Sequence, residues 1–159
     1  MTRKPPWDEE LASRLIDKHK DADGALLPIL HALQETFGYV DRAAIGAVAE
    51  ALNISKAEVH GAVSFYHDFR SAPVEGRVLK LCRAESCQAM GCEALVDHLR
   101  DAHGLTPDRP NGGSLHVETV YCLGNCALSP AALLDGAPIG RLDAAKLDML
   151  ARQAAEAAP

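Results

Sequence analysis

Two pairs of cysteines are the residues of this chain whose type and spacing point most directly to chemistry. Cys82 and Cys87 form a C-x4-C pair, and Cys122 and Cys126 form a C-x3-C pair further along. Thiolate sulfur is the preferred ligand of iron–sulfur clusters and of structural zinc, and four thiolates complete either kind of site. The two pairs can hold one metal centre only if the fold brings two separate loops together.

The spacing within the pairs favours an iron–sulfur cluster over zinc. Structural zinc usually takes tighter pairs such as C-x2-C, whereas a [2Fe–2S] cluster has two irons that each take two thiolates. Zinc and redox-active thiols stay open as alternatives on spacing alone. Free cysteines often pack as small apolar residues, but these four lie in polar segments that contain glycine.

Cys92 is the fifth cysteine, five residues after Cys87. It falls on a predicted helix over residues 88–103, where we expect it to point away from the paired cysteines and to pack against the sheet. Four ligands already complete a site, so Cys92 is predicted to be a bystander. A role as a substitute ligand or an oxidation-sensitive thiol is the alternative.

Composition and charge exclude several classes of function. The chain has 159 residues with 16 basic and 22 acidic side chains, a net charge of −6. Binding to nucleic acid or to an anionic membrane normally needs a basic surface. No apolar run approaches the roughly 20 residues that span a bilayer, and the N-terminus does not resemble a secretory signal. We therefore expect a cytoplasmic protein without direct membrane insertion, in which paired cysteines favour metal or redox chemistry over disulfides.

The first half of the chain shows helical periodicity. Pro- and acid-rich residues precede the first stripe, and Gly38 follows the second, as is typical of helix ends. The predicted helices cover residues 8–20 and 26–37, a segment capped by Asp41, and a segment opened by the capping box of Ser55 and Glu58. Short connections favour a compact bundle, so residues 1–72 are predicted to form a helical N-terminal segment.

The second half shows the pattern of a small α/β domain. Residues 71–76 read as a linker, and residues 73–159 as the domain that follows. The predicted elements are a strand over 78–81, a helix over 88–103, a loop over 106–113, a strand over 115–120, a hairpin at Asp135 and Gly136, and a final helix capped by Asp143. The fold class is therefore predicted to be α/β.

Both cysteine pairs follow strands, at the carboxyl ends where open α/β sheets place their ligands. Cys82 ends the first predicted strand, and Cys122 follows the second. If these two strands are neighbours in the sheet, their loops can face each other across one cluster. Gly124 in the second loop is expected to let backbone N–H groups approach the sulfurs, and Pro130 is a candidate for a cis peptide bond.

These segments resemble a known family. CRAESCQAMGCEALVDHL at residues 82–99 and VETVYCLGNCALSPAALLDG at residues 117–136 are similar to the thioredoxin-like [2Fe–2S] ferredoxin subunits of NADH-linked oxidoreductases. LLPILHALQETFGYV and VHGAVSFYHDF in the first half resemble the helical segment of the same family. The resemblance extends over about residues 10–155. It implies a thioredoxin-like domain with a four-stranded sheet.

The resemblance also implies a cofactor and a role. Cys82, Cys87, Cys122 and Cys126 would be the ligands of one [2Fe–2S] cluster, and no catalytic residue is expected on this chain. The protein would be an electron-transfer subunit of an NAD-linked complex, exchanging single electrons with a flavin on a partner subunit that carries the FMN and NAD sites. Other iron–sulfur or catalytic subunits are further expected partners.

Within the family, the resemblance is greatest to the gamma subunit of soluble NAD-dependent formate dehydrogenase. The 24-kDa-type subunit of complex I (NADH:quinone oxidoreductase) and the matching subunit of NAD-reducing hydrogenases are the alternatives. The family motif often reads E-C-L-G-A-C-x-x-A-P, whereas Tyr121 and Asn125 stand here at the Glu and Ala positions. Such a change of charge and amide content beside a cluster alters its reduction potential.

Other interpretations are weaker. The seven histidines are scattered with no pair at metal-ligand spacing, and are expected to be solvated or hydrogen-bonded. Residues 45–69 resemble a helix-turn-helix, which suggests a redox-sensing DNA-binding regulator, but the second helix has too few basic side chains for phosphate contacts. A thiol oxidoreductase lacks its C-x-x-C motif. Phe65 and Tyr66 either form a docking surface or close the core of the bundle.

Overall fold

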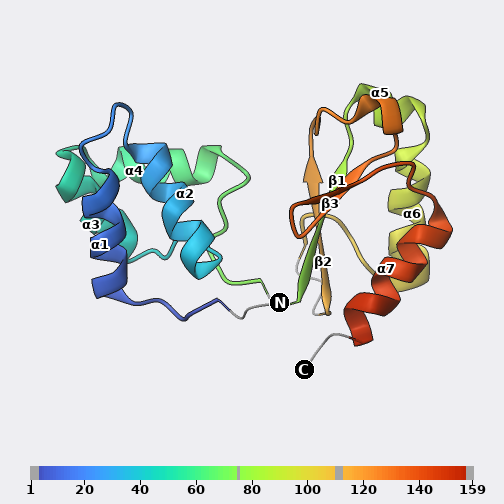
Figure 1. Ribbon diagram of the computed structural model, residues 1–159, viewed down its shortest axis with the longest axis horizontal. Helices are drawn as coiled ribbons and strands as arrows, with labels where there is room; N and C mark the ends of the chain where they lie inside the picture. The colour runs from blue at the N-terminus through green and yellow to red at the C-terminus, as the bar shows by residue number, and fades with distance from the viewer. Residues whose placement is uncertain (1–3, 75, 110–112, 157–159) are drawn as a thin grey trace. The chain divides into compact units, whose positions relative to one another are not determined.

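The computed structural model describes residues 4–74, 76–109 and 113–156. The chain divides into two compact units, Met1–Val74 and Glu75–Pro159 (Figure 1). The first unit is helical, and the second has helices packed against a four-stranded mixed sheet. This confirms the predicted α/β class. Among the described residues, no helix combines the length and the apolar character needed to cross a bilayer.

Three of the four described helices of the first unit begin and end within a residue of the positions that the sequence indicates. Asp8 caps the first helix, where its Oδ1 accepts the N–H of Leu11 at 2.7 Å. Ser55 and Glu58 form the predicted capping box, each side chain accepting the other's backbone N–H. The helices are α1 (Glu9–His19), α2 (Leu26–Phe37), α3 (Ala44–Leu52) and α4 (Lys56–Phe65).

Asp41 does not occupy the N-cap position of α3, which corrects the prediction. The N-cap is Ala43, and its backbone N–H donates to Oδ1 of Asp41 at 2.8 Å. The N–H of Ala44 donates to the backbone carbonyl of Asp41 at 3.0 Å. Asp41 therefore forms a turn that leads into the helix, because an Asp side chain often binds the backbone N–H two residues later.

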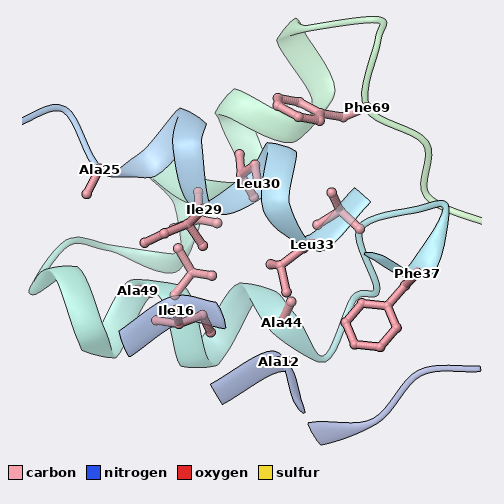
Figure 2. Packing of buried hydrophobic residues seen from close by; sticks show 13 residues of the cluster. Ala12, Ile16, Ala25, Ile29, Leu30, Leu33, Phe37, Ala44, Ala49 and Phe69 are labelled. Carbon is pink, nitrogen blue, oxygen red and sulfur yellow. The ribbon is translucent and has the colours of Figure 1, made fainter. Parts of the chain in front are cut away.

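The core of the first unit is built on α2. Ile29, Leu30 and Leu33 are completely buried, and Figure 2 shows them directed toward side chains of the neighbouring helices. On α3, the small side chains of Ala44 and Ala49 face this cluster. Small residues at a contact let helices approach closely, so leucine and isoleucine fill the space between them at high packing density.

A buried amide fastens the chain after α4 to α2. The side chain of Gln34 donates from Nε2 to the carbonyl of Asp68 at 2.6 Å and accepts at Oε1 from the N–H of Arg70 at 2.7 Å. Buried polar groups are retained when their hydrogen bonds are satisfied. The contact places Phe69 in the core, whereas Phe65 is 73% exposed.

The second unit is a short α/β domain. Its sheet has the order β2-β1-β3-β4, with β1 and β2 parallel and the other pairs antiparallel. The elements are β1 (Arg77–Cys82), α5 (Glu85–Ala89), α6 (Cys92–His103), β2 (Leu115–Val120), η1 (Cys126–Leu128), β3 (Ala132–Leu134), β4 (Ala137–Ile139) and α7 (Ala144–Glu156).

The two faces of the sheet differ in character. Leu79, Leu81 and Val117 are fully buried in a cluster with leucines of α6 and α7, which lie side by side along one face (Figure 1). On the alternate positions, Lys80 pairs in register with Glu118, and their charged atoms lie 3.9 Å apart. The alternation of the strands therefore directs apolar side chains toward the helices and charged ones to the other face.

Two glycines show where the prediction from the sequence is right and where it is wrong. Asp135 and Gly136 both have positive φ, 51° and 87°, as the two-residue turn between β3 and β4 requires. The predicted helix over 88–103 is instead two helices, α5 and α6, because Gly91 adopts φ 88° and interrupts the backbone. The predicted linker and loop include residues 75 and 110–112, which lie outside the described residues.

Gly140 provides a test of how the chain after Cys126 is held in place. A Cβ added at Gly140 would lie 2.5 Å from Cβ of Leu128. The next two residues, Arg141 and Leu142, donate backbone hydrogen bonds to the carbonyls of residues 128 and 130. We expect Gly140→Ala to destabilise this unit by about 1–3 kcal/mol, as overpacking does. Amide hydrogen exchange at Arg141 and Leu142 should become faster.

Gly61→Ala on α4 is the matched control. Apart from the neighbouring residues and backbone of its own helix, no atom of the described residues lies within 4 Å of the added methyl group, and alanine favours helix over glycine. Exchange at Arg141 and Leu142 should be unchanged in this variant. Equal exchange rates in the wild type and in Gly140→Ala would show that Gly140 does not constrain the segment.

Candidate metal centre

The parallel pairing of β1 with β2 brings the two cysteine segments to one edge of the sheet. Cys82, the last residue of β1, lies opposite Val120, the last residue of β2. Cys122 follows two residues later. The two strands are neighbours, as one shared site requires. Both cysteine segments follow strand carboxyl ends, where α/β sheets bind their ligands.

Hydrogen bonds on both sides fix the backbone around Cys82. Its N–H donates to the carbonyl of Ala131 at 3.0 Å, and the N–H of Arg83 donates to the carbonyl of Val120 at 2.9 Å. Cys82 is therefore held between the end of β2 and the segment that follows Cys126. A residue bound on both sides keeps its side chain in one direction, as a ligand position needs.

Cys87 reaches the same region from α5. This helix is short, and Cys87 is buried in it. The Cys87 sulfur lies 3.5 Å from the hydroxyl oxygen of Ser129. That hydroxyl is also within 2.8 Å of the Ser86 hydroxyl and donates to the carbonyl of Cys126 at 2.9 Å. Two serine hydroxyls thus connect the two cysteine segments.

The second cysteine loop has an unusual backbone. Cys122 and Gly124 both have positive φ, 71° and 72°. A non-glycine residue in this region costs free energy and is found at ligand-binding sites when the surrounding structure enforces it. Cys126 opens the 3-10 helix η1, and the peptide bond between Ser129 and Pro130 is cis, as predicted. Cys122 and Cys126 are exposed, in contrast to Cys82 and Cys87.

Backbone dipoles surround the sulfur of Cys82. Desolvation acts to raise the pKa of this thiol, but hydrogen bonds from the backbone of Ala84 and from the Cys87 thiol outweigh it. Backbone N–H groups of Cys122 and Leu123 add to the effect, so the pKa of Cys82 lies below its ordinary value. Converging N–H groups of this kind form a cradle for a negatively charged sulfur.

The four sulfurs lie close enough to influence one another. The charge of Cys122 raises the pKa of Cys126, together with desolvation and smaller contributions from Cys87 and Cys82. Like charges this close disfavour ionisation of each thiol unless a cation shares the site. The arrangement can therefore hold a positively charged metal centre between the two segments.

Cys92 differs from its predicted position. It is completely buried in a cluster with Cys82, Cys87 and Ala131, so the prediction that it points away from the paired cysteines is wrong. The reason is Gly91: because it interrupts the helix, Cys92 is the first residue of α6 and faces the cysteine segment. Its thiol lies 3.7 Å from Oε1 of Glu93.

Other residues at this edge were not singled out from the sequence. Arg83 forms two hydrogen bonds to the carboxylate of Glu93, at 2.9 Å and 2.7 Å. Ser86 and Ser129 bridge the cysteine segments through their hydroxyls. Ser86 adjoins Cys87 in the sequence, and this adjacency was the available signal. The partners of Arg83 and Ser129 lie 10 and 43 residues away and follow no local pattern.

Comparison with known proteins agrees with this geometry. A family described as thioredoxin-like [2Fe–2S] ferredoxin matches residues 12–155. A subunit of the NADH-quinone oxidoreductase of Rhizobium meliloti (strain 1021) is 33% identical over 138 residues, which cover 84% of this chain and 80% of that protein. The HndA subunit of the NADP-reducing hydrogenase of Solidesulfovibrio fructosivorans is 29% identical over 126 residues, which cover 76% of this chain and 71% of that protein.

A solved structure has the same fold. The crystal structure of an NAD+-reducing [NiFe]-hydrogenase in the air-oxidised state superposes with a TM-score of 0.67 at 30% sequence identity. The match covers 82% of this chain but 23% of the hydrogenase chain. This chain is therefore similar to a small part of that protein.

The pKa of Cys92 leads to a test in metal-free protein. Burial, followed by the charge of Glu93, raises this pKa to about 11. At pH 8 only about 0.1% of such a thiol is thiolate, the reactive form. We expect iodoacetamide to alkylate the exposed Cys122 and Cys126 first and Cys92 at least roughly a hundredfold more slowly, as measured by peptide mass spectrometry.

Alkylation in denaturant is the control, since all five thiols should then react at similar rates. If Cys92 in the folded, metal-free chain reacts as fast as Cys126, then Cys92 is not buried as described.

Proposed function

Because this chain belongs to the thioredoxin-like [2Fe–2S] ferredoxin family, we propose that Cys82, Cys87, Cys122 and Cys126 are the ligands of its [2Fe–2S] cluster. The observation that carries this proposal is the meeting of two cysteine pairs at the carboxyl ends of neighbouring parallel strands. One pair approaches from the β1–α5 side and the other from the loop after β2.

The donor set fits the cluster. A [2Fe–2S] cluster takes four thiolates, and these sulfurs already interact with one another. Backbone N–H groups directed at Cys82 stabilise its anionic form. The positive φ at Cys122 and Gly124 turns the second loop back toward the first. Zinc would also accept four thiolates, and metal analysis separates the two.

We propose that the chain is an electron-transfer subunit. When bound, the cluster accepts and releases one electron at a time. Two of the proposed ligands, Cys122 and Cys126, are exposed. Tyr121 beside them is 72% exposed, and Met90 after α5 is exposed as well. Exposed apolar side chains next to a redox centre suit close approach of a partner protein.

The partner that we propose is a flavoprotein subunit with FMN and NAD sites. The relatives are named as subunits of NADH-quinone oxidoreductase and of a hydrogenase that reduces NADP. A flavin converts a hydride into single electrons, which a one-electron carrier can then accept. We propose that this chain exchanges electrons with such a flavin and itself binds no substrate.

For the complex as a whole, we propose a soluble, cytoplasmic NAD-dependent formate dehydrogenase, with this chain as its gamma subunit. This choice rests on the sequence resemblance, and NADH-quinone oxidoreductase and NAD-reducing hydrogenase are the alternatives. Purification of the intact complex, followed by assays with formate, hydrogen and a quinone, identifies the substrate. NAD+ reduction by hydrogen alone would exclude formate dehydrogenase.

We further propose a division of tasks along the chain, with the cluster in residues 73–159 and a docking segment in residues 1–72. Phe65 and Tyr66 support the second part because they are 73% and 44% exposed at the end of α4. Phe69, four residues after Phe65, lies in the core instead. The two exposed rings therefore do not close the core of the bundle.

The ligand assignment is tested by EPR on anaerobically prepared protein after reduction with dithionite. We expect a spin-half signal, with about two irons and two sulfides per chain. Cys82→Ser and Cys122→Ser should each lose most of the cluster, because each removes one of four ligands. Cys92→Ser is the matched control and should keep both the signal and the iron content.

One alternative outcome would reject electron transfer for this chain. Stoichiometric zinc, no sulfide and no EPR signal would show a structural metal site. Loss of the cluster in Cys92→Ser, together with its retention in Cys82→Ser, would show that the ligand assignment is wrong.

Ser129 leads to a prediction about the reduction potential. The Cys87 thiol donates to the Ser129 hydroxyl oxygen at 3.5 Å. Once Cys87 is a thiolate, the hydroxyl can turn its one proton from the carbonyl of Cys126 to this sulfur. Hydrogen bonds to cluster sulfurs favour the reduced, more negative state. We expect Ser129→Ala to lower the midpoint potential by tens of millivolts, since about 1 kcal/mol corresponds to roughly 40 mV for one electron.

Ser64→Ala on α4 is the control for potentiometric titration. The Ser64 hydroxyl donates to the carbonyl of Gly61 within the first unit. Its removal should leave the midpoint potential unchanged. An unchanged or higher potential in Ser129→Ala would show that this hydroxyl does not stabilise the reduced cluster.

A further inference from the structure

Two histidines and an aspartate converge between α6 and α7. Nε2 of His98 and Nε2 of His103 each lie 2.7 Å from the same oxygen, Oδ1 of Asp148. The two imidazole rings are nearly perpendicular, with their centroids 5.8 Å apart. The three donor atoms all lie within 4.8 Å of one another. None of these residues is among the cysteines or their hydrogen-bond partners described above.

We propose that His98, His103 and Asp148 bind a divalent transition-metal cation of the zinc class. Imidazole nitrogen and carboxylate oxygen are the ligands that proteins offer to Zn²⁺, and also to Ni²⁺, Co²⁺ and Cu²⁺. Calcium and magnesium take all-oxygen sites instead, so two imidazoles exclude them. This site is independent of the proposed cluster ligands.

The geometry needs little adjustment. Zn²⁺ takes nitrogen and oxygen ligands at about 2.0–2.1 Å, so two ligands of a tetrahedral site lie roughly 3.3–3.4 Å apart. For the cation to enter, the two contacts of 2.7 Å must lengthen by less than about 1 Å. The two Nε2 atoms, which lie within 4.8 Å of each other, must approach by no more than about 1.5 Å. All three side chains keep partial exposure, 29% for His98, 22% for His103 and 37% for Asp148, which leaves room for rotation.

The same exposure decides the type of site. A closed structural zinc site has four protein ligands, whereas three protein ligands leave a position for water. Solvent reaches all three side chains, so water can complete the coordination. We therefore expect an exchangeable cation held with moderate strength.

The charges around the site favour a cation. Hydrogen bonds from His103 and then from His98 hold the pKa of Asp148 below its ordinary value, so the carboxylate is ionised at neutral pH. His103 is the last residue of α6, where the unpaired carbonyls of the helix favour positive charge. Arg152 on α7 donates from Nε to the backbone carbonyl of Asp148 at 3.2 Å rather than to its carboxylate.

The proton balance is simple. Without a cation, each Nε2–H donates to Asp148, and the lone pair needed for a metal is on Nδ1. On binding, each neutral ring moves its proton from Nε2 to Nδ1 and coordinates through Nε2. A neutral ring therefore releases no proton, whereas a protonated ring releases one. Acid should weaken binding for this reason.

Sequence spacing did not reveal this site. His98 and His103 are five residues apart on α6, and this is not a spacing that places two ligands on one helical face. They converge because Asp148, which is 45 residues beyond His103, lies between them on α7. The expectation that these histidines are hydrogen-bonded is confirmed.

The test is calorimetric titration of the full, cluster-loaded chain with Zn²⁺, with visible absorption recorded alongside to show that the cluster stays intact. We expect one zinc per chain. His98→Gln and Asp148→Asn should each weaken binding by more than about tenfold, since even the partners of metal ligands are typically worth 10–100-fold. His60→Gln, on the exposed surface of α4, is the matched control and should bind zinc as the wild type does.

A second measurement on the wild type guards against variants that do not fold. In long-range ¹H–¹⁵N NMR spectra, Zn²⁺ should shift the Nε2 resonances of His98 and His103. It should also convert each ring from the tautomer protonated on Nε2 to the one protonated on Nδ1. Unchanged imidazole resonances at saturating zinc, or equal affinity in wild type and His98→Gln, would overturn the proposal. Zinc uptake that bleaches the cluster absorption without changing these resonances would place the zinc at the cysteines and overturn it as well.

Discussion

The parallel pairing of β1 with β2 is the constraint on which the cysteine site depends. The cysteine pairs are separate in sequence, and neither pair alone supplies four ligands. In-register pairing of Cys82 with Val120 places the end of one strand beside the end of the other. A shift by one residue would turn Leu79 and Leu81 away from the helices, so burial of the sheet fixes the same register that aligns the cysteines.

The rest of the second unit maintains this alignment. The β3–β4 hairpin begins directly after the segment that binds the N–H of Cys82, and residues 141 and 142 bind that segment from its other side. Ser86 and Ser129 connect α5 to η1. Each cysteine segment is thus bound to its neighbours, so the positions of the four proposed ligands do not depend on a bound metal alone.

Local signals in the sequence predicted the elements, while contacts between distant residues decided the rest. The capping box of Ser55 and the turn at Asp135 involve residues within a few positions, so spacing alone was sufficient. The burial of Cys92 depended on a left-handed Gly91, which a helical pattern of apolar residues does not indicate. The convergence on Asp148 requires that α6 pack beside α7, and no spacing encodes that contact.

The charge around the sulfurs bears on the potential of the centre. Arg83 follows Cys82 directly, but its guanidinium is bound by both carboxylate oxygens of Glu93. This pair adds no net charge beside the site. The sulfur of Cys82 is instead stabilised by backbone N–H groups, which are neutral dipoles. Since net charge and hydrogen bonding set the potential of an iron–sulfur cluster, the negative charge of the four proposed thiolate ligands would lower the potential of a bound cluster, while the N–H groups directed at Cys82 would raise it.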